Sequence, residues 1–260
     1  MRRFTRGCLK TAAVFAAIGG AFCIAGFCLG FESSELQRAI ESGKNQVIKD
    51  EWISNIDLGG EMHSFAEEYS DIDTLKLDGV LNCRLIPYGG TVWKVTGSAV
   101  PMGFQVKQNG KTLKISNTGK KFWIFGETES GEELEIYIPK TVTLDELALD
   151  LDVGDVEMPE DSYLTCKKVE IDCGVGSCAL NLNVTKKVKI DCGVGDVALN
   201  LQGKESDFDY DLECGAGTLL YGKNEYSGLG TEQERNGSAQ KEIKAECGVG
   251  SVSIQFEQES

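Results

Sequence analysis

The chain has 260 residues, enough for one or two domains, and its 41 acidic residues outnumber its 26 Lys and Arg, giving a formal net charge of −15. So negative a balance argues against nucleic acid and anionic membrane surfaces as partners. A single histidine, His63, excludes a histidine-cluster metal site and any catalytic pair that needs two histidines. The acidic surface is therefore expected to be solvated, or to meet cations or basic partners.

The N-terminal part of the chain predicts a membrane anchor. Residues 1–10 contain Arg and Lys but no acid, and residues 11–31 contain no charge. As a helix, 11–31 would be about 31 Å long, close to the hydrocarbon thickness of a bilayer. The positive-inside rule then predicts a cytoplasmic basic tail at 1–10, a transmembrane anchor at 11–31 and an extracytoplasmic remainder. A cleaved signal peptide is the alternative.

Two further features belong to this region. Gly26 and Gly30 are spaced so that two anchors could pack together into an oligomer. Residues 32–70 are predicted to be a juxtamembrane helix or linker, because apolar residues recur every three or four positions up to Trp52. Residues 55–70 carry no clear pattern.

From Ile72 onward the apolar period changes to two, which predicts a β-rich domain over 71–260. The expected strands lie around Leu75–Leu77, before Pro87, at Trp93–Val95, at Phe104–Val106, at Leu113–Ile115 and at Leu134–Pro139. Asn109-Gly110 predicts a type I′ turn in a hairpin. The apolar run Phe122–Phe125 is either an exposed adhesive tip or a buried strand that caps the core.

A repeated phrase, Asp-Cys-Gly-Val-Gly, dominates residues 149–256. In its clearest copy the apolar residues alternate up to Gly195-Asp196 and then alternate again. The alternation predicts inward side chains at Val188, Ile190, Cys192 and Val194, and again at Val197, Leu199 and Leu201. The Gly-Asp pair between them is expected to turn a corner.

The copies recur at intervals that suit a solenoid. Their second glycines are Gly154, Gly176, Gly195, Gly217 and Gly250, so the spacings are 22, 19, 22 and 33 residues. Repeats of about 20 residues with two strands each predict a right-handed β-solenoid, or β-helix-like fold, of about five glycine-rich coils. The longer last spacing contains the polar stretch 222–241, which is expected to loop out between the last two coils.

In such a stack the cysteines of successive copies would form an inward column. Its members are Cys173, Cys192, Cys214 and Cys247. Three interpretations are open: a ladder of small buried side chains, disulfides between neighbouring coils, or a soft-metal site. The first is favoured, because in-register side chains suit neither the disulfide dihedral angle nor tetrahedral coordination.

The residue before each of these cysteines is acidic and should point outward, and so is the residue before Leu151, which takes the cysteine's place in the first copy. The resulting column is Asp150, Asp172, Asp191, Glu213 and Glu246. Two interpretations are open: solvent and salt tolerate the repulsion, or a cation such as calcium bridges the carboxylates, although no recognised calcium loop is present. We therefore predict no catalytic, cofactor or metal site, and keep these acids as cation candidates.

These motifs, in this order, resemble a bacterial family of unknown function, DUF4097, also called a proposed adhesin. The resemblance runs from Ile72 to Phe256 and rests on Asp73–Leu77, Lys111–Ile115, Ile138-Pro139 and the closing repeats, above all Asp209–Gly217 and Glu246–Ser251. It implies a β-solenoid or roll-like domain, often exported behind one membrane anchor in Gram-positive bacteria. It implies no activity and no catalytic residue.

Three functions follow from these observations. The first is a non-catalytic, membrane-anchored extracytoplasmic binding or scaffold module for a protein or a cell-envelope polymer. The second is a sensory or regulatory subunit of an envelope-stress system that acts through a membrane partner. The third is a carbohydrate-active β-helix enzyme with Asp150, Asp172 or Asp191 as its acids, by fold analogy only. No cofactor is expected, because no phosphate loop or other cofactor motif is present.

Overall fold

The computed structural model describes residues 62–80, 82–101, 104–117 and 133–257. These residues form twelve strands and a short 3₁₀ helix at Glu205–Asp207, so the predicted all-β fold is confirmed. None of the described residues forms a helix long and apolar enough to cross a membrane. The predicted tail, anchor and glycine pair, residues 32–61 of the predicted juxtamembrane helix or linker, and Phe122–Phe125 lie outside the described residues. Within the rest of that predicted segment, Met62–Tyr69 is a strand of the β domain.

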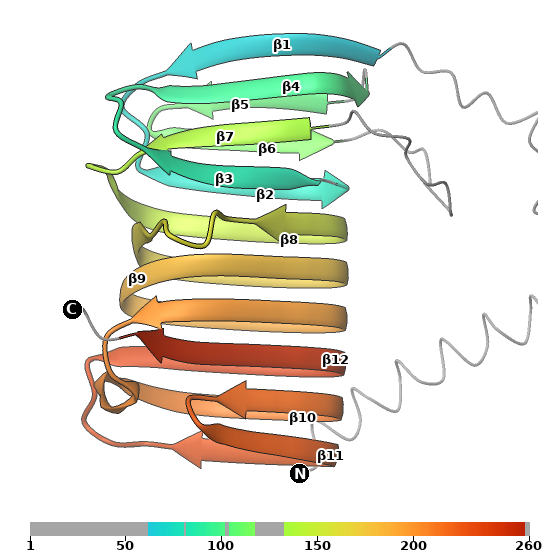
Figure 1. The fold of residues 1–260 in the computed structure, drawn as a ribbon, viewed down its shortest axis with the longest axis vertical. Helices are drawn as coiled ribbons and strands as arrows, with labels where there is room; N and C mark the ends of the chain where they lie inside the picture. The colour runs from blue at the N-terminus through green and yellow to red at the C-terminus, as the bar shows by residue number, and fades with distance from the viewer. Residues whose placement is uncertain (1–61, 81, 102–103, 118–132, 258–260) are drawn as a thin grey trace, which may run out of the picture. The chain divides into compact units, whose positions relative to one another are not determined.

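The strands fall into a set of shorter ones and a set of long ones (Figure 1). The shorter strands are β1 (Met62–Tyr69), β2 (Thr74–Val80), β3 (Cys83–Tyr88), β4 (Trp93–Pro101), β5 (Phe104–Asn109), β6 (Thr112–Asn117) and β7 (Glu133–Pro139). The later strands are β8 (Thr143–Glu157), β9 (Leu164–Gln202), β10 (Phe208–Tyr221), β11 (Asn224–Arg235) and β12 (Lys241–Glu257). β9 alone has 39 residues and makes two successive coils.

The strands build two facing walls. In the first wall, β5 pairs with β6, β6 with β2, and β2 with the first part of β8. In the second wall, β1 pairs with β4, β4 with β7, β7 with β3, and β3 with the last part of β8. β8, β9, β10 and β12 are long because each coil contributes first to one wall and then, beyond its glycine corner, to the other.

Glycine makes these corners. The second glycine of every copy has a positive φ, between 135° at Gly250 and 157° at Gly217. A Cβ atom on Gly195 would lie 1.9 Å from the carbonyl oxygen of Gly176 in the neighbouring coil. A side chain here would therefore be strained and would also collide with backbone, so the repeat needs glycine at this position.

The order of the coils differs from the order of the repeats in the sequence. β12 lies between β9 and β10 and runs parallel to both, so the coil of Gly250 is inserted before the coil of Gly217. The prediction that 222–241 forms a polar loop between the last two coils is wrong. Most of that stretch is β11, which pairs antiparallel with β10 through a two-residue turn and ends the sheet.

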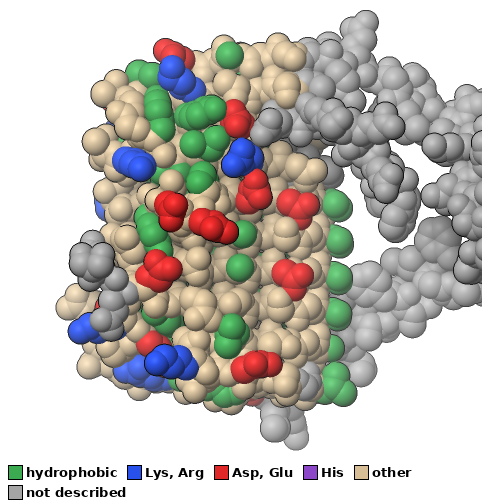
Figure 2. All heavy atoms as spheres, viewed as in Figure 1, with side chains coloured by type: hydrophobic (Ala, Val, Ile, Leu, Met, Phe, Trp, Pro, Cys, Tyr) green, Lys and Arg blue, Asp and Glu red, His purple; other side chains and the backbone are tan. Residues whose placement is uncertain are grey.

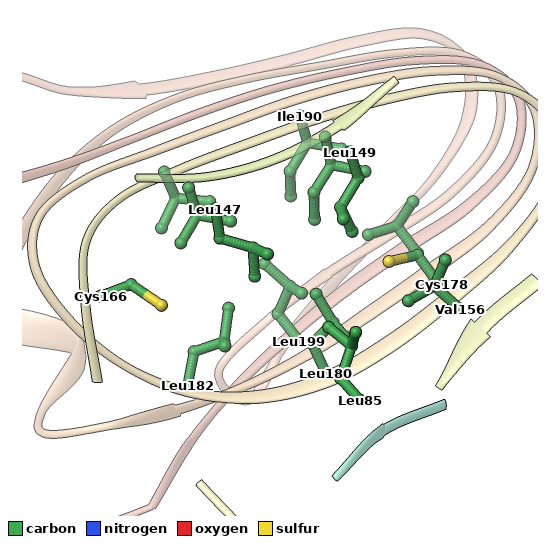
Figure 3. Packing of buried hydrophobic residues seen from close by; sticks show 14 of the residues in the cluster. Leu85, Leu147, Leu149, Val156, Cys166, Cys178, Leu180, Leu182, Ile190 and Leu199 are labelled. Atoms are coloured by element: carbon green, nitrogen blue, oxygen red, sulfur yellow. The ribbon is translucent and has the colours of Figure 1, made fainter. Parts of the chain in front are cut away.

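The interior between the walls is apolar. Figure 3 shows Leu147, Leu149 and Ile190 on one side of the core, facing Leu180, Leu182 and Leu199 on the other. All six are 1% exposed or less. Burying such a side chain contributes about 1.5–3 kcal/mol, so the alternating pattern of each coil is the main force that closes the two walls on each other.

In the N-terminal part, the predicted strands are present but two details differ. The hairpin β5–β6 pairs Asn109 with Thr112, so its loop is Gly110-Lys111, and only Gly110 has a positive φ. That is the pattern of a type II′ turn and not of the predicted type I′ turn, which needs positive φ at both loop residues. In addition, β1 occupies part of the segment that carried no clear pattern.

Candidate functional site

The tip of each corner carries an exposed apolar residue. Val194 lies between Gly193 and Gly195 and is 36% exposed, so the prediction that it points inward is wrong, although Val188, Ile190 and Cys192 are buried as predicted. The register between coils skips the residue before this valine, because the chain is already turning there. The corner is therefore Gly-Val-Gly, with the valine outside.

The residue after the second glycine links one coil to the next. The Asp155 carboxylate accepts hydrogen bonds from the backbone nitrogen and the hydroxyl of Ser177, at 2.9 and 2.6 Å, and the Asn82 side chain accepts one from the Asp155 nitrogen. Ser251 likewise donates to Asp196. These bonds hold neighbouring corners together.

The predicted acidic residues form one continuous column on the first wall. In spatial order the column is Asp78, Asp150, Asp172, Asp191, Glu246, Glu213 and Glu232, and Asp78 and Glu232 extend it beyond the predicted members. Partial burial, followed by the charges of Asp172 and Glu246, raises the pKa of Asp191 above its usual value. Partial burial and neighbouring acids raise the pKa of Asp150 and of Glu213 in the same way. The column therefore concentrates negative charge along the first wall.

A second column on the same wall relieves part of this charge. Lys189 lies 2.6 Å from Glu170, which lowers the pKa of that carboxyl, and Lys244 lies 3.3 Å from Asp211. At the N-terminal end of the acidic column, Lys114 pairs directly with Asp78. Exposed pairs of this kind contribute at most about 1 kcal/mol each, so they orient side chains more than they stabilise the fold.

The acidic column does not assemble a metal centre within the described part of the chain. No three Asp, Glu, His or Cys residues there are placed to hold a metal ion. Asp150, Asp172 and Asp191, the acids considered for an enzyme, lie on the exposed face of the first wall, in register with one another and with further acids of the column. What the arrangement offers chemically is a row of carboxylates that a basic partner could meet.

The four repeat cysteines are buried free thiols. Cys192 and Cys214 both lie in register with Cys247, and the thiols hydrogen-bond along the column. The hydrogen bond with Cys173 lowers the pKa of Cys192, but the hydrogen bond with Cys247 and burial outweigh it and raise that pKa to about 12. The structure thus supports the ladder of small buried side chains among the three interpretations.

The second wall differs from the first over the glycine-cornered coils. Ala179 and Ala198 are exposed there, and Asn200 donates a hydrogen bond of 2.8 Å to Asn181 of the adjacent coil. Asn181 in turn donates to the Pro159 carbonyl oxygen at 2.9 Å. Figure 2 shows a face on which charged side chains are scattered among uncharged surface. This wall offers little charge to a partner.

A comparison with known protein families finds one that matches part of this chain. Residues 94–206 match the Toastrack DUF4097 family. The resemblance inferred from the sequence motifs is thereby confirmed. The matched DUF4097 range covers most of β4, then β5 to β9, and includes the three copies with Gly154, Gly176 and Gly195, whereas the copies with Gly217 and Gly250 follow it.

Two solved structures are similar to the chain. A proposed cell adhesion protein from Clostridium sporogenes has 18% identity and a TM-score of 0.53, with 76% of this chain and 100% of that chain covered. A proposed adhesin from Bacteroides fragilis has 17% identity and a TM-score of 0.35, with 75% and 98% covered. No curated protein matches the chain. The similarity to the Clostridium sporogenes structure supports the β fold described above.

Proposed function

We propose that the protein is a non-catalytic binding or scaffold module, held at the cell membrane by residues 11–31 and displayed outside the cytoplasm. It presents the stiff surface of the stacked coils to a protein or a polymer of the cell envelope. The main support for this proposal is the unbroken acidic column on the outer face of the first wall. The inner face of that wall is covered by apolar side chains and thiols. The chemically distinctive groups lie on the surface, where a large partner can reach many of them at once.

The regularity of the stack supports binding of an extended or repetitive partner. Neighbouring strands lie about 4.8 Å apart, so the seven acids of the column span roughly 29 Å in a straight line. Many weak charge contacts along such a line add up only when both partners are rigid. The hydrogen bonds between corners and the close approach of the corner glycines supply that rigidity on this side.

Binding of the full chain to isolated cell envelopes tests the proposal. The full chain in phosphatidylcholine nanodiscs should co-sediment with envelopes at low salt, and binding should weaken as salt rises. Asp172→Asn/Asp191→Asn/Glu246→Gln, which removes three charges from the middle of the column, should reduce binding, whereas Ala179→Ser/Ala198→Ser on the second wall should not. Envelopes treated with protease separate a protein partner from a polymer. Absence of binding at every salt concentration would contradict the proposal.

A further inference from the structure

A line of exposed apolar side chains runs along the glycine corners. In spatial order it is Val153, Val175, Val194, Val249, Ala216 and Leu229, and we call it the corner ridge. Its four valines are 36% to 53% exposed and Leu229 is 87% exposed, and these five are the exposed large apolar side chains of the described residues. Figure 2 shows hydrophobic side chains following one another along one edge of the molecule. At about 4.8 Å per step the ridge is roughly 24 Å long.

The fold does not explain why the ridge is apolar. Each corner needs its second glycine, because of the positive φ and the close backbone contact, but the valine between the glycines touches solvent. Threonine has the same branched shape as valine and would suit the same backbone. Single exposed apolar residues are normal on protein surfaces, whereas a continuous line of them marks an interaction surface.

The borders of the ridge are acidic or neutral. On the first-wall side the acidic column runs parallel to it, three residues before each valine. On the second-wall side, two residues after each valine, Asp155 and Asp196 alternate with Ser177 and Ser251. On the first wall, Lys189 and Lys244 lie beyond the acidic column and are paired with acids, Lys189 with Glu170 and Lys244 with Asp211 and with Glu246 of the column itself. The ridge is therefore an apolar line between negative borders.

The charges of these borders indicate which kind of partner fits the corner ridge. A second copy of the chain packed ridge to ridge would bring acids against acids, and an anionic bilayer would meet the same repulsion. A protein segment with an apolar stripe and Lys or Arg on both sides of it has the complementary pattern. That pattern belongs to a basic amphipathic helix, and about 16 residues of helix match the length of the ridge.

We propose that the corner ridge docks a basic amphipathic helix of a partner protein, whose apolar stripe lies along the valines and whose Lys and Arg meet the carboxylates on either side. This inference rests on the proposed function and names the surface and the chemistry of the partner. The valines supply the contact area, and the acids set the orientation and the salt dependence.

The test uses the full chain in phosphatidylcholine nanodiscs and a synthetic, fluorescently labelled helix of about 18 residues, with a leucine stripe between lysines. We expect salt-dependent binding, measured by anisotropy. Val175→Thr/Val194→Thr/Val249→Thr should weaken it at least about tenfold, because three apolar contacts are lost while the branched shape is kept. Val175→Ile/Val194→Ile/Val249→Ile is the matched control and should bind as well as the unchanged chain. A peptide with glutamate in place of lysine should not bind.

Several results would overturn the inference. Equal binding by the threonine variant, or by the glutamate peptide, would show that the ridge and its borders do not recognise the helix. Self-association of the unchanged chain in sedimentation, lost in the threonine variant, would assign the ridge to a second copy. Valine-dependent binding to phosphatidylglycerol vesicles would assign it to a membrane. Envelope binding that persists while the peptide fails to bind would overturn the ridge inference alone and leave the proposed binding module standing.

Discussion

The two halves of the stack reach the same two-walled shape by different means. From β8 onward, apart from the terminal strand β11, a single strand passes from the first wall to the second through a glycine corner. Before β8 each wall has its own short strands, such as β2 and β3, which meet the first and last parts of β8 separately. The comparison shows what the repeat adds: glycine corners replace connecting loops and align equivalent residues into columns. The acidic column and the corner ridge are consequences of that alignment.

Substitution of a corner glycine should give the largest difference in stability between the two halves. Gly195→Ala places a Cβ atom 1.9 Å from the Gly176 carbonyl oxygen at a φ of 146°, so we expect a loss of at least about 3 kcal/mol in the free energy of unfolding. Gly89→Ala, in the N-terminal half, meets no atom within 4 Å and should change stability by less than about 0.5 kcal/mol. Denaturant unfolding of both variants measures the difference. A similar loss of unfolding free energy in both variants would contradict the distinction between corner glycines and loop glycines.

Core truncations should not distinguish the halves. Leu77 is 1% exposed in β2 and Leu199 is 1% exposed in β9, and both face the same interior. We expect Leu77→Ala and Leu199→Ala each to cost about 2–5 kcal/mol, because each leaves a cavity in a close-packed core. Ala198→Ser, on the exposed face beside Leu199, is the control and should be nearly neutral. If only the Leu199 variant were destabilised, the two halves would not share one core.

Charge removal should have opposite signs in the two halves. The pKa of Asp191 is raised by burial and by Asp172 and Glu246, so its charged form is disfavoured in the folded chain. Asp191→Asn should therefore raise stability at pH 7 by up to about 1 kcal/mol. That gain should shrink as the pH falls through the folded pKa of Asp191, and vanish below about 3.8, where this carboxyl is protonated in the folded and unfolded chains alike.

The matched change in the N-terminal half is Asp78→Asn. Asp78 lies in the same column but is paired with Lys114, so its removal should lower stability by at most about 1 kcal/mol. Thermal unfolding of both variants between pH 3.5 and 7 gives the comparison. A loss of stability in both variants at pH 7 would mean that Asp191 also has an effective cationic partner.

The smallest expected effect concerns the thiols, which should be unreactive in both halves. Burial, followed by the charge of Glu157, raises the pKa of Cys83 to about 12. The hydrogen bond with Cys173 lowers the pKa of Cys192, but the bond with Cys247 and burial together raise it to about 12. At pH 8 neither should react with a thiol reagent in the folded chain, and both should react after unfolding without reductant. Mass spectrometry of the labelled peptides reads this directly. Rapid labelling of folded Cys192 would contradict a buried column.

The sequence alone predicts much of this structure, since alternating apolar residues and recurrent glycines are local signals. Period two identified the strands around Leu75 and Leu134, and the corner glycines were located from their spacing. The outward acids followed from the same alternation. These features depend only on which face of a strand a residue occupies.

Other features depend on contacts between distant segments, which alternation does not encode. The insertion of β12 between β9 and β10 leaves every coil with the same internal pattern, so it could not be read from that pattern. Val194 was assigned inward because the alternation was continued one step too far into the turn. A possible signal was its position between two glycines, where the chain cannot be assumed to remain a regular strand.

The order of the coils is the central claim, because the acidic column and the corner ridge both depend on it. Glu157, Ser253 and Leu220 lie in one outward column of the second wall. Spin labels can be attached at these three positions through non-thiol handles. With β12 inserted, the backbone at 253 should lie three strand spacings from 157, about 14 Å, and that at 220 four spacings away, about 19 Å. Electron paramagnetic resonance of the two labelled pairs should rank the 157–253 distance as the shorter one. A shorter 157–220 distance would mean that the coils stack in sequence order and would contradict the account.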